Sequence, residues 1–295
     1  MSISLDHPVS APAPRLSAWK TLIFVATTIV VTWVFGTAVV AWRYFNVAYF
    51  PDPEKASLAE AELPASAREI EVATRDGERL VAWYTPLEGR PLVIYLHGDI
   101  GNLSEAASRA RGIVAAGFSM LAIDYRGYGG STGTPDEAGL YIDADAAWEK
   151  AVELGYTPDR IAIVGESYGA GVALNLANRR PAAAVVVEGA YSMAADLIAE
   201  RFWGFPARLI MRNRVRSDLE VAKLRTPLLL VHGEDDAIVP IRHAWNLYAL
   251  ASGPRALLVA PGRGHLVLED PTIMTRVGAW LSARLDGGAA PARAQ

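Results

Sequence analysis

The sequence predicts an α/β domain with a mostly parallel central sheet flanked by helices, preceded by one transmembrane helix. From Arg68 onward, short apolar runs alternate with longer amphipathic segments, which is typical of βαβ units. Upstream of them lies one long apolar stretch without a charged residue. The chain has 295 residues, of which 52% are apolar, so it can bury a large core.

The apolar stretch, residues 21–42, is predicted to be the transmembrane helix, following an N-terminal tail at 1–20. As a helix it would measure about 33 Å, enough for a hydrocarbon core of about 30 Å. Aromatic residues that suit the membrane interface flank it: Trp19, Trp42 and Tyr44. A cleaved signal peptide is the alternative, because Val39-Val40-Ala41 offers small residues for cleavage, but an apolar core of this length favours the anchor.

Membrane orientation is weakly marked in the sequence. Arg15 and Lys20 before the stretch are matched by Arg43 and Lys55 after it. We expect a bacterial inner-membrane protein with its N-terminus inside and its catalytic domain on the outer, periplasmic side.

Beyond the helix we expect a juxtamembrane linker at 43–67, the α/β domain at 68–286 and a disordered tail at 287–295. A short cap region is expected at 191–225. The predicted strands are 69–74, 79–84, 92–96, 119–124, 161–164, 184–187, 227–231 and 256–259, the first two forming an edge hairpin. The predicted helices are 103–116, 134–154, 168–180, 241–252 and 271–285.

The pentapeptide Gly165-Glu166-Ser167-Tyr168-Gly169 lies between a predicted strand and a predicted helix. In that setting a G-x-S-x-G turn forces the serine into a strained bend and exposes its hydroxyl at the sheet edge. Ser167 is therefore the candidate nucleophile.

A serine hydroxyl needs a base to take its proton, and five histidines compete for that role. His7 precedes the membrane segment. His97 and His232 end apolar strands before a glycine, where an imidazole more often fixes a turn, and His243 sits inside a predicted helix, where solvation is expected. His265 follows the last strand in a glycine-containing loop and is the candidate base.

The loop His232 to Pro240 supplies candidates for the acid that orients this base. Glu234, Asp235 and Asp236 all follow a strand there, and the residue pattern by itself does not choose among them. The order serine, acid, histidine is that of α/β-hydrolases.

Six motifs in this order resemble the α/β-hydrolase superfamily, and more narrowly its membrane-anchored branch with the Bem46-like and ABHD13/ABHD17-type serine hydrolases. They are His97 to Asn102, Asp124 to Gly133, Gly139 to Ala144, the serine elbow, His232 to Pro240 and Gly262 to His265. The resemblance covers about 68–285 and implies the α/β-hydrolase fold. In the H-G-x-x-D pattern the acid is the fifth residue, which selects Asp236, with Asp235 as runner-up.

The resemblance also implies an oxyanion hole made by the backbone N–H groups of Tyr168 and Asp99. The sequence departs from the pattern here, since the family more usually has H-G-N where this chain has Asp99. A carboxylate aimed at the oxyanion would oppose it, so we expect Asp99 to point away or to pair, with Arg126 or Asn102 as candidate partners.

The implied activity is hydrolysis of a carboxylic ester or thioester through a Ser167, Asp236 and His265 triad, with no metal or cofactor required. The aromatic and apolar stretch 202–211 predicts a segment that lines an acyl-binding groove or touches the bilayer, or else a short helix that packs on the sheet. Arg208, Arg212, Arg214 and Arg216 are candidates for anionic headgroups or a solvated face.

Other function classes are less favoured. A net charge of −4 disfavours nucleic acid as a partner, and the absence of cysteine excludes disulfides and thiolate metal sites. A peptidase of the prolyl-oligopeptidase type and a catalytically inactive membrane scaffold remain as alternatives. The expected partners are a small-molecule or lipid-like acyl ester and a membrane.

Overall fold

The computed structural model describes residues 18–47, 49–201, 206–211 and 215–285, and it divides into two units at Tyr44. The predicted tail at 287–295 and the stretches 202–205 and 212–214 of the cap lie outside the described residues.

Helix α1, Ala18–Val47, belongs to the first unit up to Tyr44 and is longer than the predicted span. Its segment Ala18–Val39 has a mean hydropathy of 2.2 and no buried part. The helix is long and apolar enough to cross a membrane. A signal sequence near an N-terminus has the same properties, so length and composition leave both alternatives open.

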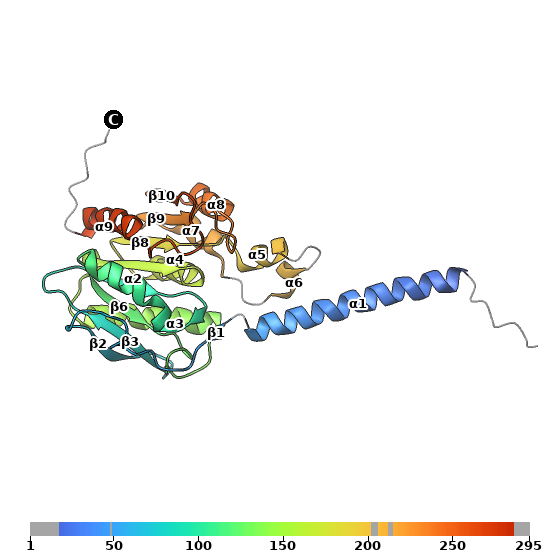
Figure 1. The fold of residues 1–295 in the computed structure, drawn as a ribbon, viewed down its shortest axis with the longest axis horizontal. Coiled ribbons are helices and arrows are strands. Elements are labelled where there is room, and N and C mark those ends of the chain that lie inside the picture. Colours follow the sequence, from blue (N-terminus) through green and yellow to red (C-terminus); the bar gives the residue numbers. More distant parts are fainter. Residues whose placement is uncertain (1–17, 48, 202–205, 212–214, 286–295) are drawn as a thin grey trace, which may run out of the picture. The chain divides into compact units, whose positions relative to one another are not determined.

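In the second unit, eight strands among the described residues form one sheet, in the order β10-β9-β8-β7-β4-β6-β3-β2 (Figure 1). These strands are β2 (Arg68–Ala73), β3 (Arg79–Thr85), β4 (Leu92–Leu96), β6 (Ser119–Ile123), β7 (Ile161–Glu166), β8 (Ala184–Glu188), β9 (Leu228–Gly233) and β10 (Arg255–Ala260). Strands β2 and β3 pair antiparallel at the edge, as the predicted hairpin requires, and β3 also pairs antiparallel with β6. All other pairs are parallel.

Helices cover both faces of this sheet, so its central strands are buried on both sides and carry continuous apolar runs (Figure 1). One face packs against α3 (Glu137–Glu153), α4 (Tyr168–Arg179), α7 (Ser217–Lys223) and α8 (Arg242–Leu250). The other packs against α2 (Leu103–Ala115) and α9 (Pro271–Leu285). A 3₁₀ turn, η1 (Pro158–Arg160), precedes β7.

Between β8 and α7, the predicted cap contains α5 (Ala194–Arg201) and α6 (Ala207–Ile210). Ala207 and Met211 are buried while Leu209 is exposed, so this described part both packs on the domain and presents an apolar side chain to solvent. Arg208 pairs with Asp196, and Arg216 pairs with Asp218. Arg212 and Arg214 lie outside the described residues.

The segment predicted as a linker contains a short strand that the sequence did not indicate. Strand β1, Phe50–Pro51, pairs in parallel with β5, Ile100–Gly101. The N–H of Phe50 donates to the Asp99 carbonyl oxygen at 2.8 Å, and the N–H of Asp52 donates to the Gly101 carbonyl oxygen at 3.0 Å. We call residues 49–52 the strap, because they bind the loop after β4.

Candidate active site

Ser167 sits at the turn between β7 and α4 with φ 50° and ψ −112°. Such a positive φ is rare for a residue with a side chain, and it marks backbone strain of the kind found at functional sites. The strand-turn-helix context that the pentapeptide predicted is therefore present.

The glycine at position 169 allows this turn to lie against the sheet. A Cβ atom at Gly169 would overlap the carbonyl oxygens of Leu96 and His97. Only glycine permits α4 to start so close to the end of β4, and this brings the serine next to the loop after β4.

Asp236 and His265 form a direct hydrogen bond, with Asp236 Oδ2 and His265 Nδ1 2.7 Å apart. The second carboxylate oxygen, Oδ1, accepts from the N–H groups of Ile238 and Val239, each at 2.8 Å. Because Nδ1 faces the carboxylate, the opposite ring nitrogen, Nε2, faces away from it.

His232 supports the same carboxylate rather than acting as a base. Its Nε2 lies 2.7 Å from the Val239 carbonyl oxygen and 3.2 Å from Asp236 Oδ2. The imidazole thus fixes the acid-bearing turn, as its strand-end position indicated. Glu234 and Asp235 are exposed, whereas Asp236 is buried.

These contacts perturb the pKa values of both partners. Burial raises the pKa of Asp236, but hydrogen bonds from His232 and His265 outweigh it and hold that pKa well below the ordinary value. Burial lowers the pKa of His265, and the hydrogen bond and charge of Asp236 raise it by more. The pair therefore favours a carboxylate beside a basic imidazole.

The other two candidate histidines of this unit are buried. His97 donates from Nδ1 to the Gly98 carbonyl oxygen at 2.7 Å, and burial lowers its pKa to about 4. The expectation that His243 is solvated is wrong: it is 4% exposed, and its ring contacts Ser192 and Glu200. The face of helix α8 that carries His243 is turned toward α5, and the local sequence did not reveal this packing.

The loop after β4 carries Asp99, and hydrogen bonds hold the peptide groups before and after this residue. The Asp99 carbonyl oxygen accepts from Phe50 N–H and from Tyr128 Oη, each at 2.8 Å. The preceding carbonyl, of Gly98, is held by His97. Because N–H and C=O point in opposite directions across a trans peptide, these bonds set the direction of the Asp99 N–H.

The predicted partners of the Asp99 side chain are wrong. Arg126 binds Asp143 and Asp76 instead, and Asn102 caps α2 by accepting from Ser104 N–H. Asp99 lies in the same cavity as Ser167 and His265. Burial raises its pKa, while its own N–H and the neighbouring His265 oppose the rise.

Sequence reasoning missed a buried ionic cluster beneath the elbow. Arg109, on α2, is 2% exposed, and its Nε lies 2.6 Å from Glu166 Oε2. It also contacts Tyr95 Oη and Glu269. Arg109 lies on the helix face that also carries Leu103 and Ala110, a position that signals burial.

A cavity of about 390 Å³ adjoins these groups. Its wall includes Ser167 and His265, and three exposed apolar side chains border it: Ile100, Ile238 and Leu266. The polar part is formed by Asp99, Glu105, Arg109 and Glu166. This composition suits a ligand with one apolar portion and a polar group near the serine.

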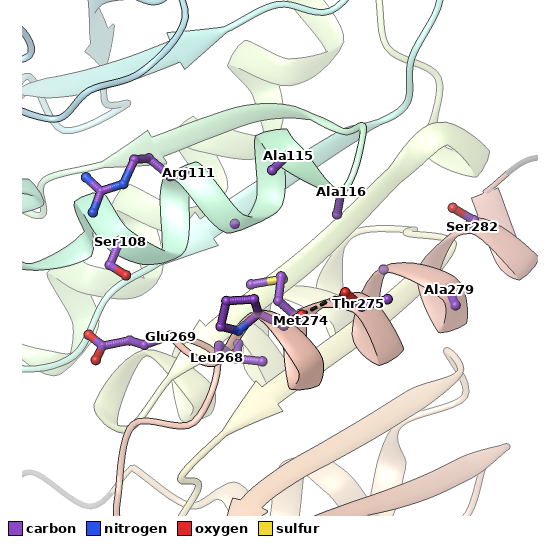
Figure 2. Close-up of a pocket in the computed structure, with 13 residues that line it drawn as sticks. Ser108, Arg111, Ala115, Ala116, Leu268, Glu269, Met274, Thr275, Ala279 and Ser282 are labelled. Carbon is purple, nitrogen blue, oxygen red and sulfur yellow. Dashed lines mark hydrogen bonds between the residues drawn. The ribbon is translucent and has the colours of Figure 1, made fainter.

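A second cavity, of about 540 Å³, lies between α2 and α9 (Figure 2). Figure 2 shows Ser108 and Arg111 on one helix, Met274 and Thr275 on the other, and Glu269 before α9. Its described lining includes none of Ser167, Asp236 and His265. The smaller cavity is therefore the candidate active site.

This fold and arrangement define an α/β-hydrolase, and comparisons with known proteins agree. The family described as serine aminopeptidase, S33, matches residues 88–221. The uncharacterized protein Rv2307c of Mycobacterium tuberculosis is 37% identical over 233 residues, covering 78% of this chain and 82% of that protein. Human protein ABHD12B is 33% identical over 234 residues, covering 68% of this chain and 63% of that protein.

Solved structures show the same fold at lower identity. The Pyrococcus furiosus esterase Pf2001 matches with a TM-score of 0.67 and 18% identity, covering 80% of this chain and 97% of that one. An α/β-hydrolase from Vibrio vulnificus matches with a TM-score of 0.61 and 21% identity, covering 75% and 82%. The chain belongs to the α/β-hydrolase superfamily, and the ABHD12B match fits its ABHD-type branch.

Proposed function

We propose that this protein is a serine hydrolase that cleaves carboxylic ester or thioester bonds through an acyl-enzyme intermediate. The observation that carries the proposal is the Asp236–His265 hydrogen bond, in a protein whose strained Ser167 borders the same cavity as His265. Such a constellation is recognised by its geometry and roles.

In the proposed reaction, Ser167 Oγ attacks the acyl carbonyl carbon while His265 Nε2 takes the hydroxyl proton. The tetrahedral intermediate collapses as that proton passes to the leaving oxygen or sulfur, which departs as an alcohol or thiol. Water, deprotonated by the same imidazole, then attacks the acyl-enzyme and restores Ser167. Asp236 fixes the imidazole orientation and stabilises its protonated form.

The developing oxyanion would be stabilised by the backbone N–H groups of Tyr168 and Asp99. Tyr168 is the first residue of α4, so its N–H belongs to the positive end of a helix dipole. The bonds that hold the peptide groups on either side of Asp99 N–H support the second donor. Preorganised donors of this kind are usually the largest electrostatic contribution to acyl transfer.

The proposed substrates are acyl esters with an apolar portion, including lipids or acylated molecules. The apolar side chains around the cavity support an acyl site, and helix α1 supports anchoring through residues 21–42. The domain limits given above and a periplasmic location of the catalytic unit are part of the same proposal.

The test uses the full-length protein in detergent micelles, with fluorophosphonate labelling and p-nitrophenyl ester hydrolysis as the two measurements. We expect Ser167→Ala to abolish labelling and to lower turnover by about 10⁶-fold. Ser192→Ala is the matched control, because Ser192 is a buried serine beside a histidine outside this cavity. Full labelling of purified Ser167→Ala would contradict the assignment of Ser167 as the nucleophile.

A peptidase is the second candidate, favoured by the serine aminopeptidase description of the matching family. The carboxylates of Asp99, Glu105 and Glu166 around the cavity suit a substrate amino group. Aminoacyl p-nitroanilides compared with esters of the same acyl group would separate the two activities. A wild-type protein that neither labels nor hydrolyses either series would be the inactive scaffold.

A further inference from the structure

We propose that Glu188 is a positioning residue that holds the segments carrying Ser167, Asp236 and His265 in register, an inference that rests on the proposed hydrolase function. Glu188 ends β8, the strand between the serine-bearing β7 and the acid-bearing β9. Its side chain is fully buried.

The backbone groups of Glu188 and Gly189 bind two of the three segments, those that carry Ser167 and Asp236. The Ser167 N–H donates to the Glu188 carbonyl oxygen at 2.8 Å, which fixes the strained turn from the adjacent strand. The Gly189 N–H donates to the Val231 carbonyl oxygen at 3.1 Å, on the strand that leads to Asp236. Any residue at position 188 could make these bonds.

The Glu188 side chain contacts the third segment, the loop that carries His265. Only a residue whose side chain places an acceptor there can make this contact. Glu188 Oε1 accepts from the N–H groups of Val267, at a short distance, and Leu268, at 2.6 Å. Both residues are buried in the loop that follows His265, and no backbone acceptor within the described part of the chain serves these two donors. Buried N–H groups left without an acceptor destabilise the fold, so these two donors need the Glu188 side chain.

Gly189 completes this contact by making room for the imidazole. It has φ +58°, and a Cβ atom there would lie 2.7 Å from His265 Cε1. The His265 imidazole therefore lies against the backbone of Gly189. The side chain of Glu188 binds the loop that carries this histidine. Displacement of this loop would move His265 relative to Ser167, and misplacement of about 1 Å can cost about 10²-fold in rate.

Glu188 acts through its acceptor atom rather than through its charge. Burial, together with the neighbouring Glu166, raises the Glu188 pKa to about 8. The raised pKa favours the neutral acid, so glutamine is the nearest mimic of this side chain. Glutamine offers one carbonyl oxygen at the same reach, which can accept from both N–H groups.

The experiment compares Glu188→Met with Glu188→Gln in the full-length protein, measuring kcat and KM for a p-nitrophenyl ester per folded molecule. Methionine fills the volume but cannot accept the two N–H groups, so we expect kcat to fall by at least about 100-fold with KM within about threefold. Glu188→Gln should restore kcat to within about tenfold of wild type. A residue that only stabilises the fold would not lower kcat per folded molecule at nearly constant KM, and its effect on kcat would not be reversed by glutamine.

Asp143→Leu is the matched control. Asp143 is also a fully buried carboxylate that accepts a backbone N–H, from Arg126 at 2.9 Å, but its hydrogen bonds reach none of the segments that carry Ser167, Asp236 and His265. We expect it to lose stability while kcat per folded molecule stays near wild type. If Glu188→Met does not fold, Glu188→Asp replaces it, since its shorter side chain cannot reach both donors and should give the same loss of kcat.

The proposal is overturned if Glu188→Met or Glu188→Asp keeps wild-type kcat, or if Glu188→Gln is as impaired as Glu188→Met. Failure of the hydrolase function looks different, because the wild-type protein itself would then lack Ser167-dependent ester hydrolysis. If Ser167-dependent activity is unchanged in Glu188→Met, the positioning role of Glu188 is contradicted and the hydrolase function is not.

Discussion

The phenol oxygens of Tyr49 and Tyr168 lie 2.7 Å apart, and the two rings meet edge to face with centroids 5.3 Å apart. Tyr168 directly follows the proposed nucleophile, and Tyr49 begins the strap. The strap also binds the loop that carries Asp99, so it contacts both proposed sources of oxyanion donors.

Tyr49→Phe should therefore affect catalysis as well as stability. Loss of this hydrogen bond is expected to lower the free energy of unfolding by about 1 kcal/mol and kcat by several-fold. Tyr156→Phe is the control, because Tyr156 and Tyr84 form a similar hydroxyl pair, 3.0 Å apart, outside the catalytic cavity. Equal kcat values in the two variants would contradict a catalytic role for the strap contact.

Removal of the whole strap should have a larger effect. A chain that begins at Phe45 keeps Tyr49 to Asp52, whereas a chain that begins at Pro53 lacks only these strap residues and the segment before them. We expect the shorter chain to hydrolyse p-nitrophenyl esters at least about tenfold more slowly, since its Asp99 loop loses two backbone hydrogen bonds. The comparison requires circular dichroism of both chains, to show that the folded fractions match.

Substitutions in the acidic turn should separate its three carboxylates. Asp236→Asn removes the charge that orients and stabilises the imidazole, and we expect kcat to fall by about 10⁴-fold. Asp235→Asn and Glu234→Gln change exposed neighbours and should leave kcat within about twofold. A large loss in Asp235→Asn with an active Asp236→Asn would transfer the role to Asp235.

Asp99→Asn should increase activity in a pH-dependent way. The pKa of Asp99 is raised by burial, so its carboxylate forms only as the pH rises through that raised value, and the charge then opposes the oxyanion. The ratio of variant to wild-type kcat/KM should rise with pH and level off at about three- to tenfold, equivalent to about 1 kcal/mol. A ratio that stays constant across the pH range would show that the Asp99 charge does not act on the reaction.

Glu188→Gln should also change the pH dependence of stability. The Glu188 pKa is raised from 4.5 to about 8, mainly by burial, so the folded protein binds this proton more tightly than the unfolded chain. Its contribution to stability is complete below the unfolded pKa and is lost as the pH rises toward about 8. In urea titrations, Glu188→Gln should gain stability relative to wild type between about pH 5 and pH 8.

The sequence predicted the main parts of the fold because its strands are buried on both faces and its helices are amphipathic. Strand β4 is a continuous apolar run, strand β8 is apolar up to Glu188, and the edge hairpin has a turn at Asp76-Gly77. Ser167, Asp236 and His265 follow the ends of parallel strands, which meet at one edge of the sheet. Their proximity could therefore be expected before any coordinates.

The strap and the Glu188 contacts could not be expected in the same way. Strand β1 has only two residues, too few to show a period of two, and its partner is about 50 residues away. The one available signal for Glu188 is a charged residue at the end of the buried run Ala184–Glu188. That position suggests a buried acceptor, but its partners, Val267 and Leu268, depend on the tertiary path of the last loop.

The strap begins eight residues after Ala41, the end of the small-residue stretch that the signal-peptide alternative offers for cleavage. Proteolytic release at that point would remove the apolar segment and leave Tyr49 bound to Tyr168. If the protein is the proposed hydrolase, the released form would therefore keep the contacts between the strap and the Asp99 loop. Retention at the bilayer and catalytic competence would then be separable properties of this chain.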